Sequence, residues 1–320
     1  MGPLAGKVAL VAGATRGAGR GIALALGEAG ATVYCTGRSV AGHPATGTRP
    51  ETIEESAALV TKAGGKGIAV RCDHTVEAEV AALAERIRQE HGRLDVLVND
   101  VWGGDALVEW GKPFWDIPYA SVRTLTERAV LSHVLTTQKM APLLGMGSLV
   151  VEVTDGDGLQ YRGQFLYDLV KATVIRLAFA WHEELSQRGV SSVAVTPGFL
   201  RSEAMLDLFG VSESNWRDFV ATEPDWAESE TPLYVGRAVA ALAADPQLAR
   251  KSGRVFASWT LAREYGFTDA DGRRPDWGRH FEKRYGKGLQ RPADEGFYVY
   301  WEGHGRMMAA VEDRKRSDAT

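Results

Sequence analysis

The sequence predicts an α/β fold: a doubly wound parallel sheet flanked by helices, followed by an aromatic-rich C-terminal extension. Three observations support this class. Short apolar stretches rich in β-branched residues alternate with longer helix-like stretches through the first 200 residues. The short stretches are apolar almost throughout, which is typical of strands in a sheet that is covered on both faces. A glycine-rich turn joins the first strand to the first helix.

Six strands and five helices are predicted in alternation. The strands are expected at residues 7–12, 31–36, 67–72, 94–98, 148–153 and 190–196. The helices are expected at residues 20–29, 51–63, 76–90, 119–144 and 164–187. Gly30 is placed to end the first helix, because glycine readily adopts the left-handed conformation found at helix C-termini. We assign residues 1–267 to one domain and residues 268–320, with the aromatic stretch 297–301, to the extension.

The composition is that of a globular protein without a polyanionic partner. The chain has 320 residues, is 45% hydrophobic and 24% charged, and has a net charge of −4 from 37 Lys and Arg against 41 Asp and Glu. This balance gives no reason to expect nucleic acid or an anionic membrane as a partner. The N-terminus lacks the pattern of a signal peptide, and no apolar run approaches the roughly 18 residues of a membrane span. We therefore expect a cytoplasmic protein in which Cys35 and Cys72 are buried thiols.

The glycine-rich turn GATRGAGRG directly follows the first strand and contains Gly13, Gly17 and Gly19. Glycines let the backbone turn sharply and approach a diphosphate, and the free N–H groups at a helix start attract its negative charge. The first strand–helix junction of an alternating chain is also where Rossmann-type folds bind dinucleotides. An ordinary tight turn is the alternative interpretation. A Walker phosphate loop is excluded, since no Gly-Lys-Ser/Thr follows.

The end of the second strand favours NADP(H) over NAD(H). NAD sites usually place an acidic residue there to bind the ribose 2′-hydroxyl. This chain has no Asp or Glu between residues 31 and 50 and ends the strand with CTGRS. Arg38 and Ser39 stand where a 2′-phosphate would lie, and Arg16 lies inside the glycine turn. The alternative is that both arginines are solvated surface charges.

Six short motifs in this order resemble the short-chain dehydrogenase/reductase family over about residues 5–265. They are GATRGAG at 13–19, CTGRS at 35–39, CD at 72–73, VND at 98–100, Thr154 followed by Tyr167-x-x-x-Lys171, and TPG at 196–198 followed by Ser202. Within the family, FWDIP at 114–118, GLQY at 158–161 and LAREYGFTDADGR at 261–273 resemble the subgroup of dehydrogenase/reductase SDR family member 1. The resemblance implies an enzyme that uses NADPH to reduce a carbonyl to an alcohol reversibly. It also implies a homodimer or homotetramer.

The resemblance also implies a role for each matching residue. Tyr167 exchanges a proton with the substrate oxygen, and Lys171, one helical turn away, lowers the pKa of Tyr167 and holds the nicotinamide ribose. The hydroxyl of Thr154 orients the substrate oxygen. The resemblance also places Asp73 and His74 at the adenine and Asn99 at the turn after the fourth strand. Pro197, Gly198 and Ser202 are expected on the nicotinamide side of the cofactor.

The sequence departs from the family pattern at three positions. Thr154 replaces a serine, which keeps the hydroxyl on a stiffer side chain. Asp100 replaces the second asparagine of the turn after the fourth strand. Family members carry a helix asparagine that supports a water relay to the lysine, and this chain has Ala129 at that position. His133, one turn further along, either replaces that link or is a core or surface histidine.

The segment 199–232 occupies the place of a substrate loop, and we expect it either to line an apolar pocket or to pack onto the domain. Its apolar residues are Met205, Leu206, Leu208, Phe209, Trp216 and Phe219. Trp102 and Trp110 are candidates for the opposite wall, so the expected partner is an apolar small-molecule substrate, either a carbonyl compound or an alcohol. No metal site is expected, because His182-Glu183 lacks the second histidine of a zinc motif. Two alternatives stay open: a nucleotide-binding protein with little redox activity, and a reductase of C=C or C=N bonds.

Overall fold

The computed structural model describes residues 2–45, 49–158 and 160–286 of the chain. Seven strands of the described chain form one parallel sheet in the order β3-β2-β1-β4-β5-β6-β7. Their bounds are β1 Val8–Ala12, β2 Thr32–Gly37, β3 Lys66–Arg71, β4 Val96–Asn99, β5 Leu149–Val153, β6 Ser191–Thr196 and β7 Val255–Ala257. The predicted parallel sheet is confirmed, and the six predicted strands agree with β1–β6 to within two residues at each end. β7 was not predicted, because its three residues run directly into a helix.

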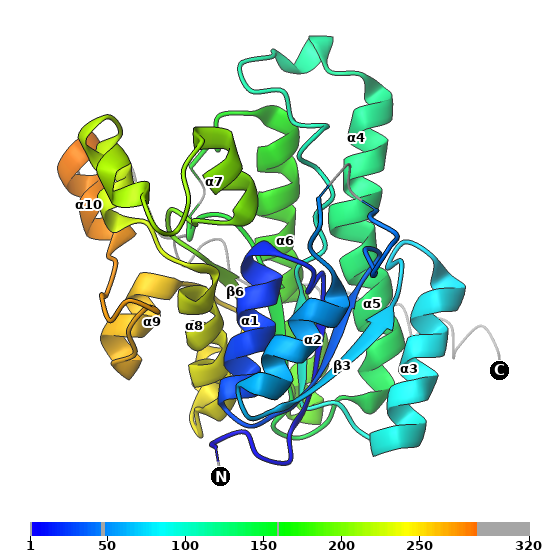
Figure 1. The fold of residues 1–320 in the computed structure, drawn as a ribbon. Coiled ribbons are helices and arrows are strands. Elements are labelled where there is room, and N and C mark those ends of the chain that lie inside the picture. The colour runs from blue at the N-terminus through cyan, green and yellow to red at the C-terminus, as the bar shows by residue number, and fades with distance from the viewer. Residues whose placement is uncertain (1, 46–48, 159, 287–320) are drawn as a thin grey trace, which may run out of the picture.

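Helices cover both faces of the sheet (Figure 1). On one face lie α1 (Gly17–Glu28), α2 (Ile53–Lys62) and α8 (Pro232–Ala244), which share a buried core with the sheet. The opposite face is covered by α3 (Glu77–His91), α5 (Ser132–Met140) and α6 (Phe165–Leu185). Cys35 and Cys72 are buried and free, as predicted. Burial raises the pKa of each thiol to about 12.

The predicted helix at residues 119–144 is continuous but not uniform. It begins as α4 (Tyr119–Thr126), widens into a π-helical turn at Glu127–Leu131, continues as α5, and ends in a 3₁₀ turn at Ala141–Leu143. Such π turns are rare and often occur beside functional sites. Ala129, the position of the missing family asparagine, lies in this turn.

The chain after β6 builds a separate set of short helices. The segment 199–232 contains α7 (Glu203–Phe209) and two 3₁₀ helices at Trp216–Ala221 and Pro224–Glu228. α9 (Ser258–Tyr265) follows β7, and α10 (Trp277–Tyr285) belongs to the predicted extension. The aromatic stretch 297–301 lies outside the described residues. Over the part of the chain that is described, no helix has the length and apolar character to span a membrane.

Candidate active site

The glycine turn lies at the carboxyl ends of β1 and β4, where the strand order changes direction. Gly13 has a φ of 94°, and a side chain at this position would collide with the main-chain carbonyl of Asp100, just beyond β4. Gly19 packs equally closely against the carbonyl of Gly13. The turn thus needs glycine at both positions to bring the start of α1 against the end of β4. In open α/β sheets this crevice is the place where ligands bind.

A carboxylate already occupies the start of α1. The main-chain N–H of Gly17, the first residue of α1, donates to Oε2 of Glu203 at 2.8 Å. Oε1 of Glu203 lies 3.7 Å from a guanidinium nitrogen of Arg20. The helix start therefore attracts an anion in this fold, as its dipole predicts. Sequence reasoning did not single out Glu203, which lies 186 positions from Gly17.

The arginines expected at the ribose phosphate are only loosely paired. Arg38, which follows β2, lies 3.8 Å from Oδ2 of Asp73. Nε of Arg16 lies 3.4 Å from Oε2 of Glu51 and is buried without a hydrogen bond. Ser39 is buried, and its hydroxyl accepts from the N–H of Ala45 at 3.1 Å. A buried donor without an acceptor is uncommon, so Arg16 fits a site that takes a further anion.

The two residues expected at the adenine have other polar partners. Oδ1 of Asp73 accepts from the N–H and the hydroxyl of Thr75 at 3.0 and 2.7 Å. The ring of His74 is buried, with one nitrogen 2.8 Å from the hydroxyl of Thr36 and the other 2.8 Å from that of Thr136. Burial lowers the pKa of His74 to about 4, so the ring is neutral at neutral pH. This arrangement leaves the main chain of His74, rather than its ring, for a cofactor contact.

The buried carboxylate of Glu152, on β5, is the common partner of several polar side chains behind the site. It accepts from Nδ2 of Asn99 at 2.8 Å and from Nε1 of Trp181 at 3.0 Å, and it lies 2.7 Å from Nδ1 of His133. The other ring nitrogen of His133 lies 3.1 Å from the carbonyl of Val101. Both ring nitrogens of His133 are therefore occupied, neither of them by Lys171. The structure supports the core interpretation of His133 and places the side chain of Asn99 in the same core network.

Tyr167 and Lys171 lie on one face of α6, next to two tryptophans. Nζ of Lys171 lies 4.6 Å from the ring centre of Trp102 and 5.7 Å from that of Tyr167. The Tyr167 ring also contacts Trp102 and Trp110, with ring centres 5.4 and 5.2 Å apart. The predicted tryptophan wall therefore lies against Tyr167. Asp105, in the same segment, accepts from Nε1 of Trp102 at 2.7 Å.

The hydroxyl of Thr154 binds the main chain of α6, whereas the next residue contacts the Tyr167 hydroxyl. Thr154 is buried and donates its hydroxyl to the main-chain carbonyl of Lys171 at 2.8 Å. The main-chain N–H of Thr154 donates to the carbonyl of Val195 at 2.9 Å and so extends the pairing of β5 with β6. Asp155, the next residue, instead accepts the Tyr167 hydroxyl on Oδ2 at 2.9 Å. The two residues that follow β5 thus both contact α6, Thr154 at its main chain and Asp155 at the Tyr167 hydroxyl.

The pKa of Tyr167 is raised well above its usual value. Burial is the largest cause, and the Asp155 carboxylate is the next. Burial lowers the pKa of Lys171, although nearby carboxylates oppose this. Asp100, one of the departures from the family pattern, has its pKa raised to about 7 by burial, against the opposing charge of Lys171. Burial and the Asp155 carboxylate thus keep Tyr167 protonated.

The residues expected on the nicotinamide side begin the loop after β6. The carbonyl of Pro197 accepts the hydroxyl of Thr196 at 2.8 Å, and the N–H of Gly198 donates to Oε2 of Glu230 at 2.9 Å. The hydroxyl of Ser202 accepts from the third residue of α7 and so caps that helix. Trp277 of α10 packs directly against Gly198. The described part of the extension therefore contacts the loop after β6 at Gly198.

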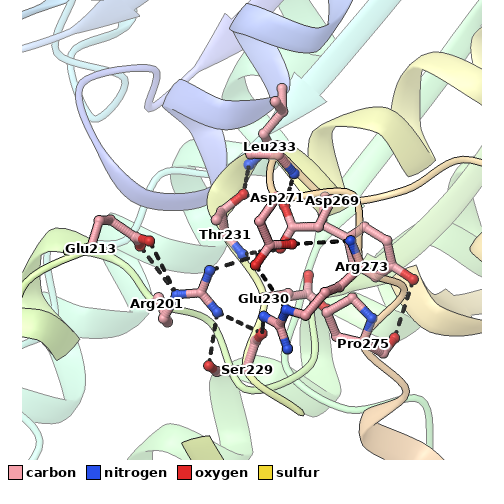
Figure 2. Close-up of polar contacts among 12 residues, drawn as sticks. Arg201, Glu213, Ser229, Glu230, Thr231, Leu233, Asp269, Asp271, Arg273 and Pro275 are labelled. Atoms are coloured by element: carbon pink, nitrogen blue, oxygen red, sulfur yellow. Dashed lines mark hydrogen bonds and ion pairs between the residues drawn. The ribbon is translucent and has the colours of Figure 1, made fainter. Parts of the chain in front are cut away.

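Polar contacts connect the loop after β6, residues 199–232, to the segment before α10 (Figure 2). The buried guanidinium of Arg201 donates to the carbonyl and hydroxyl of Ser229 at 2.6 and 2.9 Å. Asp269 accepts from the N–H of Thr231 at 2.9 Å, and Arg273 donates to the carbonyl of Ser229 at 3.1 Å. Charged groups that are buried and fully paired hold their surroundings in one arrangement. Residues 199–232 and 266–276 therefore form one unit.

Most aromatic residues of the loop pack against each other instead of lining a pocket. Trp216 is buried, with the guanidinium of Arg201 4.1 Å from its ring centre. Phe209 contacts both Phe219 and Trp226, at ring-centre distances of 5.6 and 5.4 Å. Leu208 is exposed, while Met205 and Leu206 are partly exposed. The packing interpretation thus holds for the aromatic residues of the loop.

Comparison with known proteins gives consistent matches to one family. A family model described as short chain dehydrogenase matches residues 7–209. The mouse protein dehydrogenase/reductase SDR family member 1 is 38% identical over 281 residues, which cover 85% of this chain and 86% of the mouse protein. The 7alpha-hydroxysteroid dehydrogenase of Escherichia coli K12 is 28% identical over 207 residues, covering 63% of this chain and 74% of that protein. The resemblance inferred from the sequence motifs, including the subgroup, is confirmed.

A solved structure shows the same fold. A putative dehydrogenase from Xanthomonas campestris superposes with a TM-score of 0.69 at 24% identity, covering 85% of this chain and 94% of that one.

Proposed function

This chain belongs to the short-chain dehydrogenase family, and on that premise we propose that it is an NADP(H)-dependent oxidoreductase that reduces a ketone or aldehyde to an alcohol, reversibly. The observation that carries the proposal is the position of Asp100. Its main-chain carbonyl packs against Gly13 of the glycine turn, and its carboxyl interacts with Lys171. A dinucleotide lying in the crevice at the glycine turn would thus extend toward the Tyr167–Lys171 pair.

The residues of the site have complementary roles in carbonyl reduction. The bound cofactor supplies the hydride that reaches the carbonyl carbon. Tyr167 donates its hydroxyl proton to the carbonyl oxygen, which suits a phenol that the site keeps protonated. Lys171 places a positive charge beside the phenolate that remains. Trp102 and Trp110 place an apolar surface beside the Tyr167 ring, where an apolar substrate would bind.

The preference for NADP(H) rests on Arg38 and Arg16. A hydrogen bond to a charged group contributes about 1.5–3 kcal/mol, or about 10- to 100-fold in affinity. Calorimetric titration should show much tighter binding of NADPH than of NADH. Arg38→Ala should weaken NADPH binding by that factor and leave NADH binding nearly unchanged. Equal affinity of the unaltered protein for both cofactors would rule out the assignment.

The proposed substrate is an apolar carbonyl compound. The tryptophans beside Tyr167 favour it, and the similarity to an enzyme named for hydroxysteroids agrees with it. NADPH oxidation with a panel of small polar, linear apolar and bulky cyclic ketones tests the class. Turnover only with enones or imines would favour reduction of C=C or C=N bonds instead. Tight cofactor binding without any turnover would favour the nucleotide-binding alternative.

We further propose that the protein acts in the cytoplasm as a homodimer or homotetramer. Light scattering on the purified protein measures the oligomer directly. A monomer at micromolar concentration would contradict this part of the proposal.

A further inference from the structure

A carboxylate to which the family pattern gives no role lies against the proton-donating oxygen of the proposed site. Asp155 is the second residue after β5, and its Oδ2 accepts the Tyr167 hydroxyl at 2.9 Å. The preceding hydroxyl, that of Thr154, is bound to the main chain of Lys171. Asp155 is partly exposed, whereas Thr154 is buried. The side chain that reaches Tyr167 is therefore an acid.

We propose that Asp155 is a positioning residue that holds the Tyr167 hydroxyl protonated and oriented as a proton donor. This inference rests on the proposed function, in which Tyr167 gives its proton to a carbonyl oxygen. A phenol that donates to a carboxylate gains a charge-assisted hydrogen bond. Removing the phenol proton would destroy that bond and leave two anions in contact. The pair is thus more stable with Tyr167 neutral.

The other charged groups around Tyr167 do not cancel this effect. Asp105, from the segment after β4, also disfavours the phenolate, whereas Arg162, from the loop before α6, favours it. Lys171, on the same helix, lies 5.7 Å from the centre of the Tyr167 ring. The net direction is a raised pKa of Tyr167, with burial as the first cause and Asp155 as the second. Asp155 is the only one of these groups for which the structure gives a hydrogen bond to the Tyr167 hydroxyl.

The contact between Asp155 and Tyr167 should make carbonyl reduction and alcohol oxidation depend differently on pH. In reduction, a hydride from NADPH reaches the carbonyl carbon while the Tyr167 proton moves to the oxygen, and solvent then returns a proton to the phenolate. In oxidation, the phenolate must exist first, because it accepts the proton of the alcohol. With Asp155 beside it, the phenolate forms only at alkaline pH. Reduction should therefore persist through neutral pH, and oxidation should rise only above it.

Fluorine NMR of the protein carrying fluorotyrosine at position 167 measures the ionisation of this residue without cofactor or substrate. Asp155→Asn keeps the size and an acceptor oxygen but removes the charge, and it should lower the pKa of residue 167 by at least about one unit. Asp155→Glu restores the charge and should recover part of the shift. Asp157→Asn is the matched control, because it removes a charge from the same turn and Asp157 is not among the main causes of the raised pKa of Tyr167. An Asp155→Asn protein that folds and titrates like the unaltered one overturns the inference.

The pH profile of alcohol oxidation is the second measurement. In Asp155→Asn, the pH at which the rate of alcohol oxidation rises should fall by the same number of units as the pKa of residue 167. A fall of one pH unit would increase the oxidation rate at neutral pH about tenfold. The same profile in both proteins would overturn the inference. A shifted NMR titration in a protein that reduces no carbonyl would still support the pairing of Asp155 with Tyr167. That result would count against the proposed function alone, so the two failures can be told apart.

Discussion

Replacing Glu203 by Gln should strengthen the binding of NADPH. Oε2 of Glu203 accepts the N–H of Gly17 at 2.8 Å, at the helix start where the proposed cofactor would place its diphosphate. The two anions compete for one donor, so the carboxylate must leave before the cofactor binds. A neutral carboxamide holds the N–H less strongly and repels the diphosphate less. The change should therefore favour the bound state.

The magnitude follows from the hydrogen bond. A hydrogen bond to a charged group contributes about 1.5–3 kcal/mol and a neutral one about 0.5–1.5 kcal/mol. The Glu203 side chain is 28% exposed, which places its contribution near the lower end of the charged range. The difference is about 1 kcal/mol, so NADPH should bind about fivefold more tightly. The gain should shrink at high salt, because screening weakens exposed charges.

Calorimetric titration of NADPH into both proteins measures this difference. Glu55→Gln is the matched control, since Glu55 also pairs with Arg20, at 3.3 Å, without contacting Gly17. It should leave NADPH affinity nearly unchanged. Binding to Glu203→Gln that is equal to or weaker than binding to the unaltered protein would refute the competition between Glu203 and the diphosphate.

Three further predictions concern the rest of the site. Tyr167→Phe should fold and bind NADPH while its turnover falls about 10²- to 10⁴-fold, and an unaltered rate would mean that another group supplies the proton. Burial raises the pKa of Glu230 to about 8, from its usual 4.5, so the folded state holds this proton more tightly than the unfolded state. Stability should therefore fall as the pH rises from about 4.5 to about 8, and Glu230→Gln should flatten this dependence in thermal melts; an unchanged dependence would contradict the prediction. Trp277→Ala removes the packing against Gly198 and should cost about 2 kcal/mol, or a melting temperature about 3 °C lower, with a higher KM for the ketone. Trp277→Phe should recover most of both effects, and an unchanged KM would show that α10 does not shape the site.

The glycine turn and the helix face that carries Tyr167 and Lys171 were predictable because each depends on neighbouring residues. Gly13, Gly17 and Gly19 are close in the chain, and their spacing predicts a turn that only glycine tolerates. Tyr167 and Lys171 share a helix face because four residues make about one turn. The π-helical turn at Glu127–Leu131 was not predictable, since the pattern of apolar residues in a π turn hardly differs from that in an α-helix.

By itself, the sequence determined the parallel sheet, the position of the glycine turn and the family, since strand and helix patterns and short motifs are local features of the chain. Only the tertiary structure decided which side chains meet. It placed Glu203 on the N–H of Gly17, enclosed the His74 ring between two threonines, and put Asp155 rather than Thr154 against Tyr167. These contacts depend on where separate segments of the chain meet. No local pattern encodes them, because each contact joins side chains or main chain from different elements.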